Sequence, residues 1–425
     1  MRHPGTLPTI NKEAVRQVLR VGVAVGGTLA DETEFSRKNY FYPDIPKGYQ
    51  ISQYAQPLVS AGTLHGVALT RIHLEEDTGI SMHDQGDYSL LDFNRAGVPL
   101  LELVTEPVIH SGRDASLFAR ELQLLLRALG ASDANMEKGE MRIEANISVG
   151  IGEKLGTKVE VKNLNSFKAV ERAIEYETKR QSTLLERGGR VAQETRGWNE
   201  QKQETFSQRA KEESHDYRYF REPDLPMLRV SLVPEFSTNA LNKDIQELPS
   251  EKRTRYHAEG ISEACTEMFI ANPVFATLFE QASARVPQVK HIVANLIGTE
   301  IAGLVSQYGE SGFANITPDG LSTIATQYVS GILSSRGAKD ALAEAFRTGG
   351  DLSHLSEKYA QQNDTNTLQS AVKKALAENP VAVADYKKGK QSALQYLVGA
   401  CMKDMRGAGN PQLLRDLLFE EMLHG

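Results

Sequence analysis

The stretch RIHLEED, residues 71–77, places three carboxylates side by side. Side chains of an extended strand alternate between its two faces, so we expect His73 and Glu75 on one face, while Glu76 continues the apolar face. Adjacent carboxylates repel one another, and their crowding requires water, a cation or a positively charged partner. From these residues alone, Glu76 is either already in solvent beyond the strand or bound to such a partner.

A second stretch, RAGVPLLELVTEP at 95–107, predicts a turn followed by a buried strand over 100–104. Glu102 lies in the middle of that apolar run. An ionised carboxylate there is costly unless it is paired or bound to a metal. Two explanations stay open: an ion pair with an arginine such as Arg95, or a hard cation, Mg²⁺ first of all, bound by Glu76 and Glu102.

The composition limits the class of protein. A chain of 425 residues predicts two or three domains, and a net charge of −7 confines any nucleic-acid contact to a patch. The two cysteines, Cys265 and Cys401, exclude a disulfide framework and a cysteine-based zinc site. No apolar run reaches the roughly 20 residues that span a bilayer, so we expect a soluble, cytoplasmic protein.

Several common active-site motifs are absent from the sequence. It has no phosphate-binding P-loop, no dinucleotide-binding glycine motif after a strand and no HExxH zinc motif. It also lacks the serine-rich glycine loop that an amidase uses. If the protein handles nitrogen, a partner must release it.

The pattern of secondary structure changes near residue 245, from short strands and turns to helices. Before that point we predict a helix from Asp114 to Gly130, a hairpin of 141–149 with 157–165, and a long helix over 166–187. After it, Thr317–Pro318 opens a helix with a core stripe of Leu321, Ile324, Tyr328 and Ile332.

Two surfaces are charged. In the hairpin, Glu144, Asn146 and Lys162 lie on the polar faces of the two strands, which suits a cleft or a solvated surface equally. Near the C-terminus, a helix with an apolar face at Leu394, Leu397, Val398 and Cys401 lies in a basic segment. Residues 373–406 contain seven Lys and Arg against three Asp and Glu, which is typical of a solvated face or of a phosphate-binding one.

Seven stretches, in order along nearly the whole chain, resemble the GatB family, the B subunits of the aspartyl/glutamyl-tRNA amidotransferases. They are RKNYFYPDIPKGYQISQY (37–54), RIHLEEDTG (71–79), DFNRAGVPLLELVTEP (92–107), MRIEANIS (141–148), KVEVKNLNSF (158–167), KEESHDYRYFREPDLP (211–226) and NPQLLRDLL (410–418).

The resemblance implies a two-step reaction on mischarged tRNA. ATP phosphorylates the side-chain carboxylate of Glu-tRNA(Gln) or Asp-tRNA(Asn), and ammonia then displaces the phosphate. The ammonia comes through a tunnel from a partner amidase, and a small third protein completes a heterotrimer. The implied fold is α+β: a mixed or antiparallel-sheet cradle (1–245), a helical domain (246–355) and a small helical, YqeY-like tail domain (356–425) that contacts tRNA.

The resemblance also implies roles for individual residues, each of which has an ordinary structural alternative. We expect Mg²⁺ on Glu76 and Glu102, with Glu144 as a third catalytic carboxylate. Positively charged and polar side chains are expected at ATP or the acyl phosphate: Lys47, Asn94, Arg95 and Lys162. Contacts to the acyl group or tRNA are expected from Asn146, Tyr217, Arg218, Tyr219, Lys387, Lys388, Lys390, Lys403 and Arg406.

One departure from the family pattern bears on activity. The family's first strand carries a Gly-Leu-Glu-Val-His motif whose Glu and His complete the metal site, whereas this chain begins MRHPGTLPTINKEAV, inside that pattern. A misassigned start or a fragment would explain this, and so would a degenerate protein; either way we expect an exposed sheet edge. The alternative functions are therefore a catalytically inactive tRNA-binding or assembly subunit and a free-standing ligase for a small carboxylate.

Overall fold

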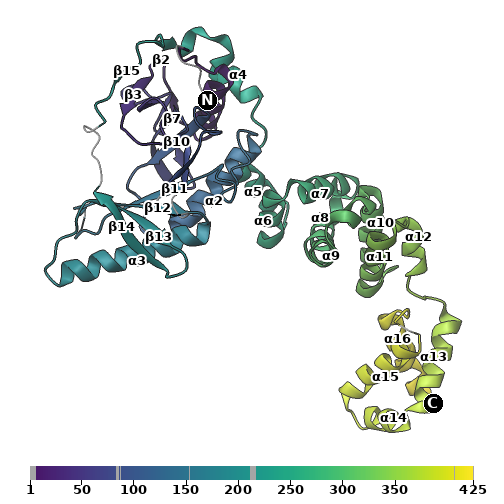
Figure 1. Cartoon of the computed structure of the whole chain (residues 1–425). Coiled ribbons are helices and arrows are strands. Elements are labelled where there is room, and N and C mark those ends of the chain that lie inside the picture. Colours follow the sequence, from purple (N-terminus) through teal and green to yellow (C-terminus); the bar gives the residue numbers. More distant parts are fainter. Residues whose placement is uncertain are drawn as a thin grey trace. The chain divides into compact units, whose positions relative to one another are not determined.

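The computed structural model describes residues 6–82, 86, 88–152, 154–210, 217–405 and 407–424. The chain divides into two compact units, Met1–Glu251 and Lys252–Gly425. All the named strands belong to the first unit, and the second is built from helices (Figure 1). The predicted order of an α+β part followed by helices is confirmed. The finer domain boundaries at 245 and 355 stay predictions.

The largest sheet of the first unit is antiparallel and contains the long strand β7 (Val67–Glu76). Its strand order is β1 (Thr28–Leu29), β5 (Val59–Ser60), β7 and β10 (Pro99–Thr105), and β6 (Thr63–Leu64) also pairs with β7. Helix α1 (Lys12–Ala24), capped by Asn11, contacts β7 and shares one core with it. The sheet therefore has one face closed by apolar packing.

The register of β7 and β10 fixes which polar side chains lie together. Leu101 pairs with Leu74, so Glu102 lies opposite His73. Within the described chain β10 pairs only with β7, and its residues 100–105 are half-buried. The prediction of a buried strand over 100–104 is wrong here, because an apolar run does not distinguish an edge strand from a central one.

Three small antiparallel sheets complete the strands of the first unit. Strand β3 (Ser36–Asn39) lies between β4 (Tyr49–Ser52) and β15 (Phe220–Arg221). Strand β2 (Glu32–Thr33) pairs with β16 (Leu228–Arg229), and β8 (Ile80–Met82) pairs with β9 (Leu90–Asp92). Residues 217–229 thus return to the first strands of the chain.

A second sheet has the order β11 (Ile143–Ile147), β12 (Val159–Leu164), β13 (Glu194–Asn199) and β14 (Glu204–Ala210). The predicted hairpin is confirmed, since β11 and β12 pair antiparallel and bury alternate residues. The helices predicted at 114–130 and 166–187 are α2 (Gly112–Ala128) and α3 (Phe167–Glu186), with Ser111 and Ser166 as N-caps. Helix α3 packs on β11, β12 and β14.

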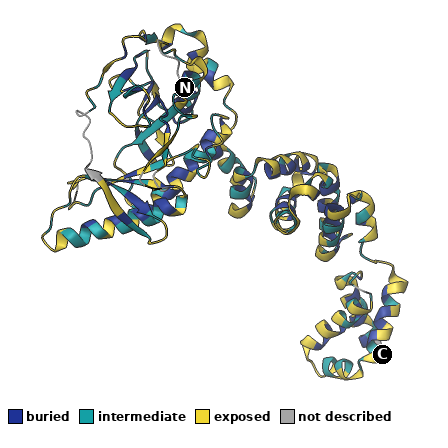
Figure 2. Ribbon diagram, viewed as in Figure 1, coloured by how far each residue is buried: buried dark blue, intermediate teal, exposed yellow. Residues whose placement is uncertain are grey.

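The second unit contains two separate apolar cores. The first lies among α5 (Pro249–Ala258), α6 (Glu263–Ala271), α7 (Pro273–Arg285), α8 (Lys290–Asn295), a π-helical segment (Leu296–Ile301), α9 (Ala302–Tyr308), α10 (Pro318–Val329), α11 (Ser335–Thr348) and α12 (Leu352–Lys358). The second lies among α13 (Thr365–Glu378), α14 (Pro380–Lys387), α15 (Gln391–Asp404) and α16 (Pro411–His424). Many of these helices have one buried and one exposed side (Figure 2).

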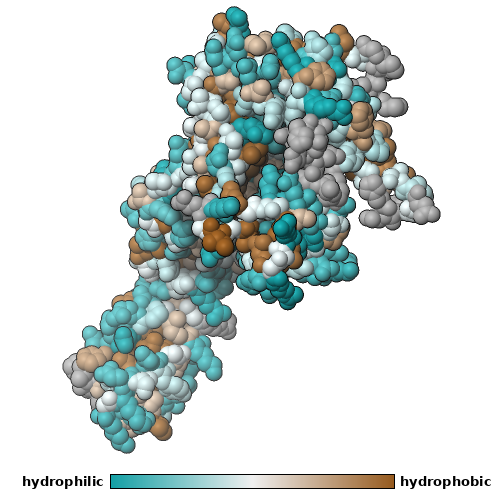
Figure 3. Space-filling view, turned by 90° about the vertical axis from the view of Figure 1, so that its left-hand side faces the viewer, coloured by the Kyte–Doolittle hydropathy of each residue, from teal (hydrophilic) through white to brown (hydrophobic). Residues whose placement is uncertain are grey.

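The predicted core stripes of the second unit are largely confirmed. Leu321 and Ile324 are fully buried, as are Leu397 and Cys401 in the last core. Ile332 is a correction: α10 ends at Val329, and Ile332 is 43% exposed beyond it. Among the described helices, none combines the length and the apolar character needed to cross a lipid bilayer. The face seen in Figure 3 is mostly hydrophilic, with apolar side chains in small groups.

Candidate metal centre

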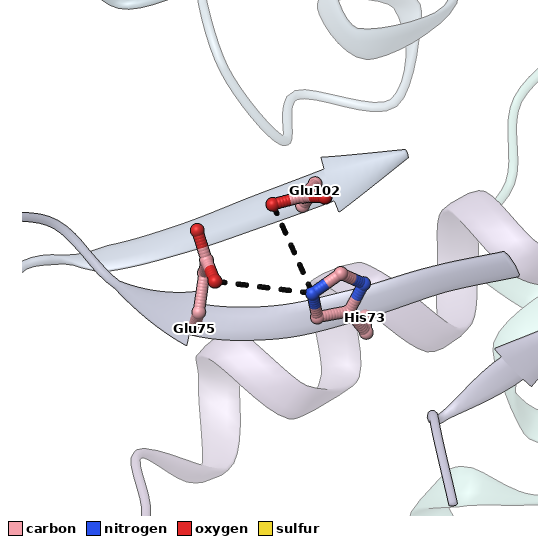
Figure 4. Close-up of side chains that lie close together, drawn as sticks. All are labelled: His73, Glu75 and Glu102. Atoms are coloured by element: carbon pink, nitrogen blue, oxygen red, sulfur yellow. Dashed lines mark ion pairs between the residues drawn. The ribbon is translucent and has the colours of Figure 1, made fainter. Parts of the chain in front are cut away.

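His73, Glu75 and Glu102 form a cluster on one face of the β7–β10 pair (Figure 4). One ligand atom from each residue lies within 4.8 Å of the others. The Nε2 atom of His73 is 3.9 Å from Glu75 Oε2 and 3.9 Å from Glu102 Oε2. Strand alternation puts His73 and Glu75 on the same side, and the antiparallel register adds Glu102.

The cluster has polar atoms that lack partners. The side chains of His73 and Glu75 are 3% and 5% exposed, whereas that of Glu102 is 40% exposed. Within the described chain, His73 Nδ1 and Glu75 Oε2 are buried without a hydrogen bond. Buried polar groups are normally satisfied. One imidazole and two carboxylates are donors that suit a divalent cation, so the residues present fit a metal.

The two carboxyl groups of the cluster differ in electrostatic environment. Burial raises the pKa of Glu75, but His73 and the positive charge of Lys38 outweigh it and lower that pKa to about 2. Burial and the negative charge of Glu75 raise the pKa of Glu102. Glu75 is therefore held as a carboxylate, and a cation would favour the same charged form of Glu102.

Glu76 points to a different set of partners. Its carboxylate pairs with Lys47 and accepts a 2.8 Å hydrogen bond from the backbone N–H of Ile51. Its backbone carbonyl accepts another, 2.5 Å long, from the side chain of Gln50. Glu76 thus links β4 to the end of β7 through hydrogen bonds. The strands do not bring Glu76 into the cluster with Glu102, and a metal contact of Glu76 stays a prediction.

Asp77, the third carboxylate, binds two arginines. Its side chain, 5% exposed, accepts hydrogen bonds from Arg95 (2.7 Å) and Arg142 (2.6 Å). The three carboxylates of RIHLEED thus lie in different surroundings: Glu75 in the His73 cluster, Glu76 beside Lys47, and Asp77 between two arginines. The neighbouring Asn94 is exposed, and its backbone N–H donates to Asp92.

The comparisons with known proteins match nearly the whole chain. A family model described as the GatB/GatE catalytic domain matches residues 1–233, and one described as the GatB domain matches residues 277–422. The B subunit of the aspartyl/glutamyl-tRNA(Asn/Gln) amidotransferase from Caldanaerobacter subterraneus is 42% identical, over 99% of this chain and 90% of that protein. The protein of the same name from Thermus thermophilus is 42% identical with the same coverage. The chain belongs to the GatB family.

Lys38 is a residue of this GatB-family site that the sequence prediction missed. Its ammonium lies 5.2 Å from the ring centre of Tyr217 and 5.8 Å from that of Tyr40. Burial lowers the pKa of Lys38, but the negative charge of Glu75 outweighs it and the pKa lies above its ordinary value. His73 and Glu75 were also missed as candidates, although alternation in 71–77 had already placed them together.

The charged and polar side chains of the hairpin lie on one face of the β11–β12 pair, as predicted. Lys162 Nζ lies 3.0 Å from Glu144 Oε1 and 4.0 Å from Glu160 Oε2. Burial lowers the pKa of Lys162, but Glu144 and Glu160 raise it more. Asn146 pairs with Glu160 across the strands and is exposed. These side chains form an ion-paired surface, and their roles toward a ligand stay predictions.

The predicted tRNA contacts lie in two places. Tyr217 and Tyr219 have ring centres 6.0 Å apart, in a group of tyrosines next to Lys38, and Arg218 between them is exposed. In the second unit, Lys390 pairs with Asp385 at 2.9 Å. Lys387, Lys388 and Lys403 lie on α14 and α15 or the turn between them. Arg406 lies outside the described residues.

Proposed function

We propose that this GatB-family chain is the phosphorylating subunit of an aminoacyl-tRNA amidotransferase. It would use ATP to activate the side-chain carboxylate of Glu-tRNA(Gln) or Asp-tRNA(Asn), and ammonia would convert the activated group to the amide. The observation that supports this most is the His73–Glu75–Glu102 cluster with its buried, unpartnered polar atoms. The names of the relatives agree with a protein that acts on these two tRNAs.

The chemistry needs charge neutralisation more than a covalent catalyst. An oxygen of the substrate carboxylate attacks the γ-phosphorus, and the bond to the bridging oxygen breaks to release ADP. Ammonia then attacks the acyl carbon, the carbon–oxygen bond to phosphate breaks, and the nitrogen loses a proton. Phosphoryl transfer of this kind is catalysed by positioning and by positive charge around the transferring group.

The residues of the chain supply that environment. His73, Glu75 and Glu102 would hold Mg²⁺, which when bound neutralises negative charge on the phosphates. Lys38 adds a positive charge beside the cluster, and its ammonium lies near the rings of both Tyr40 and Tyr217. Arg95 and Arg142 share one carboxylate, Asp77, so their pair keeps a net positive charge for an anionic ligand.

The proposal includes partners and a compartment. The sequence has no glutamine-hydrolysing motif, so a separate amidase would supply ammonia and a small third protein would complete the assembly. Mischarged tRNA and ATP would be the substrates, and we expect the reaction to take place in the cytoplasm. The basic residues of α14 and α15 would then contact the tRNA body.

Purified protein, given ATP, Mg²⁺, ammonium chloride and Glu-tRNA(Gln), tests the proposal without the amidase. We expect Gln-tRNA to form, and Glu102→Gln to abolish its formation while the tRNA affinity is unchanged. Glu310→Gln, at an exposed position of the second unit, is the control and should keep full activity. Binding of tRNA without any Gln-tRNA, in wild type and variant alike, would instead support a non-catalytic assembly subunit.

A further inference from the structure

Tyr54 is an exposed aromatic residue with an unusual partner. Its ring stacks on that of Tyr219, with ring centres 4.3 Å apart and planes inclined by 9°. Tyr54 is nevertheless 48% exposed. Tyr219 covers one face of the ring, and nearly half of the Tyr54 surface is open to solvent. The pair is therefore an aromatic surface that a further flat ring can reach.

This surface is continuous with the candidate metal centre through other tyrosines. Tyr219 packs edge-on against Tyr217, and Tyr217 packs edge-on against Tyr40 at 5.7 Å. Lys38 lies against the rings of Tyr40 and Tyr217, and its charge interacts with Glu75 and Glu102. The aromatic row thus begins beside the carboxylate cluster and ends at Tyr54.

Both rings of the Tyr54–Tyr219 stack come from anchored backbone. Arg218 has a positive φ of 44°, which is uncommon for a residue with a side chain. Asn39 holds this turn: its side chain donates to the carbonyls of Tyr217 (3.2 Å) and Arg218 (2.9 Å). Beside Tyr54, the buried side chain of Gln53 accepts a 3.0 Å hydrogen bond from the backbone N–H of Leu74. The stack is therefore positioned before any ligand arrives.

A flat, half-exposed aromatic pair suits the π-face of an unpaired nucleobase, which stacks on such platforms in single-stranded nucleic-acid binding. In an aminoacyl-tRNA, the amino acid is esterified to the terminal ribose, so the terminal base accompanies the reacting carboxylate. We propose that Tyr54, supported by Tyr219, is the platform on which the unpaired terminal base of the aminoacyl-tRNA stacks. This inference rests on the proposed function, because the acyl group must reach the carboxylate cluster.

A double-mutant cycle, which combines a change in the protein with a change in the tRNA, tests the platform. Binding is measured for wild type and Tyr54→Ala with intact tRNA and with tRNA that lacks its terminal adenosine. Loss of the stacking ring in Tyr54→Ala should weaken binding of the intact tRNA by about 5- to 150-fold. The affinity for the shortened tRNA should be unchanged. Tyr54→Phe keeps the ring and should bind as wild type. Tyr308→Ala removes a tyrosine of similar exposure, 47%, from α9 and should change neither affinity.

Equal losses on intact and shortened tRNA would overturn the platform, because Tyr54 would then act through structure or another contact. No loss on either tRNA would overturn it as well. The cycle uses affinity alone, so it separates this inference from the proposed function. If Tyr54→Ala weakens binding only of the intact tRNA but no Gln-tRNA forms, the platform is upheld and the proposed reaction is rejected. If Gln-tRNA forms but Tyr54→Ala affects both tRNAs equally, the reaction is upheld and the platform is rejected.

Discussion

Glu222→Gln should substantially destabilise the first unit. Glu222 is fully buried, and Arg37 donates to both of its carboxylate oxygens at 2.8 Å, from Nε and from Nη2. The same carboxylate accepts a 3.1 Å hydrogen bond from the backbone N–H of Asp224. The Arg37 guanidinium also lies 4.3 Å from the ring centre of Tyr49. The pair joins β15 and the turn after it to β3.

The size of the destabilisation follows from leaving the Arg37 guanidinium without its carboxylate partner. Removing one member of a buried ion pair costs about 3–5 kcal/mol. Glutamine has nearly the same shape and keeps one acceptor for Arg37, so we expect the lower end, about 3 kcal/mol. For a unit of this size, that lowers the melting temperature by about 6–12 °C.

The effect should depend on pH. Burial raises the pKa of Glu222, but the hydrogen bonds from Arg37 and the Asp224 backbone outweigh it, so the folded-state pKa lies below the ordinary value of 4.5. A lowered carboxyl pKa stabilises the protein above the unfolded-state pKa, and the contribution is lost as the pH falls through the folded-state pKa. Wild type should therefore approach the variant in stability only below about pH 4.

The assay is urea unfolding followed by fluorescence of Trp198. This residue is the only tryptophan of the chain and is buried, 5% exposed, in the first unit. Glu235→Gln is the control: its ion pair with Lys12 is exposed at both partners, so the change should cost less than about 1 kcal/mol. A loss for Glu222→Gln as small as the control's, or one that persists undiminished in acid, would refute the reasoning.

Two further predictions concern the neighbouring carboxylates. Glu75→Gln should weaken Mn²⁺ binding, measured by titration calorimetry, at least about tenfold, and more than Glu76→Gln does, because the Glu76 carboxylate is paired with Lys47; the opposite ranking would show that the cluster is wrongly assigned. Asp77→Asn should destabilise the first unit by about 1.5–3 kcal/mol in the Trp198 assay, because Arg95 and Arg142 lose charged hydrogen bonds but are themselves 31% and 50% exposed; a loss below that of Glu235→Gln would contradict this role.

The parts of the fold that sequence could predict are those coded locally. Helix α3 has a serine N-cap and a glycine stop, and the β11–β12 hairpin has clear alternation. The wrong prediction for Ile332 arose because the helical spacing of apolar residues was extended past Val329, where α10 ends.

The candidate site depends on pairings that sequence does not reveal. Alternation in 71–77 already grouped His73 with Glu75, but only the register with β10 shows that Glu102 joins them instead of Glu76. Lys38 was missed because β3 is four residues long and β15, which pairs with it, comes from residues 220–221. Such long-range contacts carry no periodic signal in the chain.

Transfer of phosphate to the aminoacyl group tests the central claim most directly. The protein is incubated with Mg²⁺, Glu-tRNA(Gln) and ATP labelled in its γ-phosphate, without ammonia, and label on the tRNA is measured. We predict label that appears only on aminoacylated tRNA, disappears when ammonium is added, and is absent with Glu102→Gln. Label that never reaches the tRNA, with tRNA bound and the variant behaving as wild type, would contradict the account.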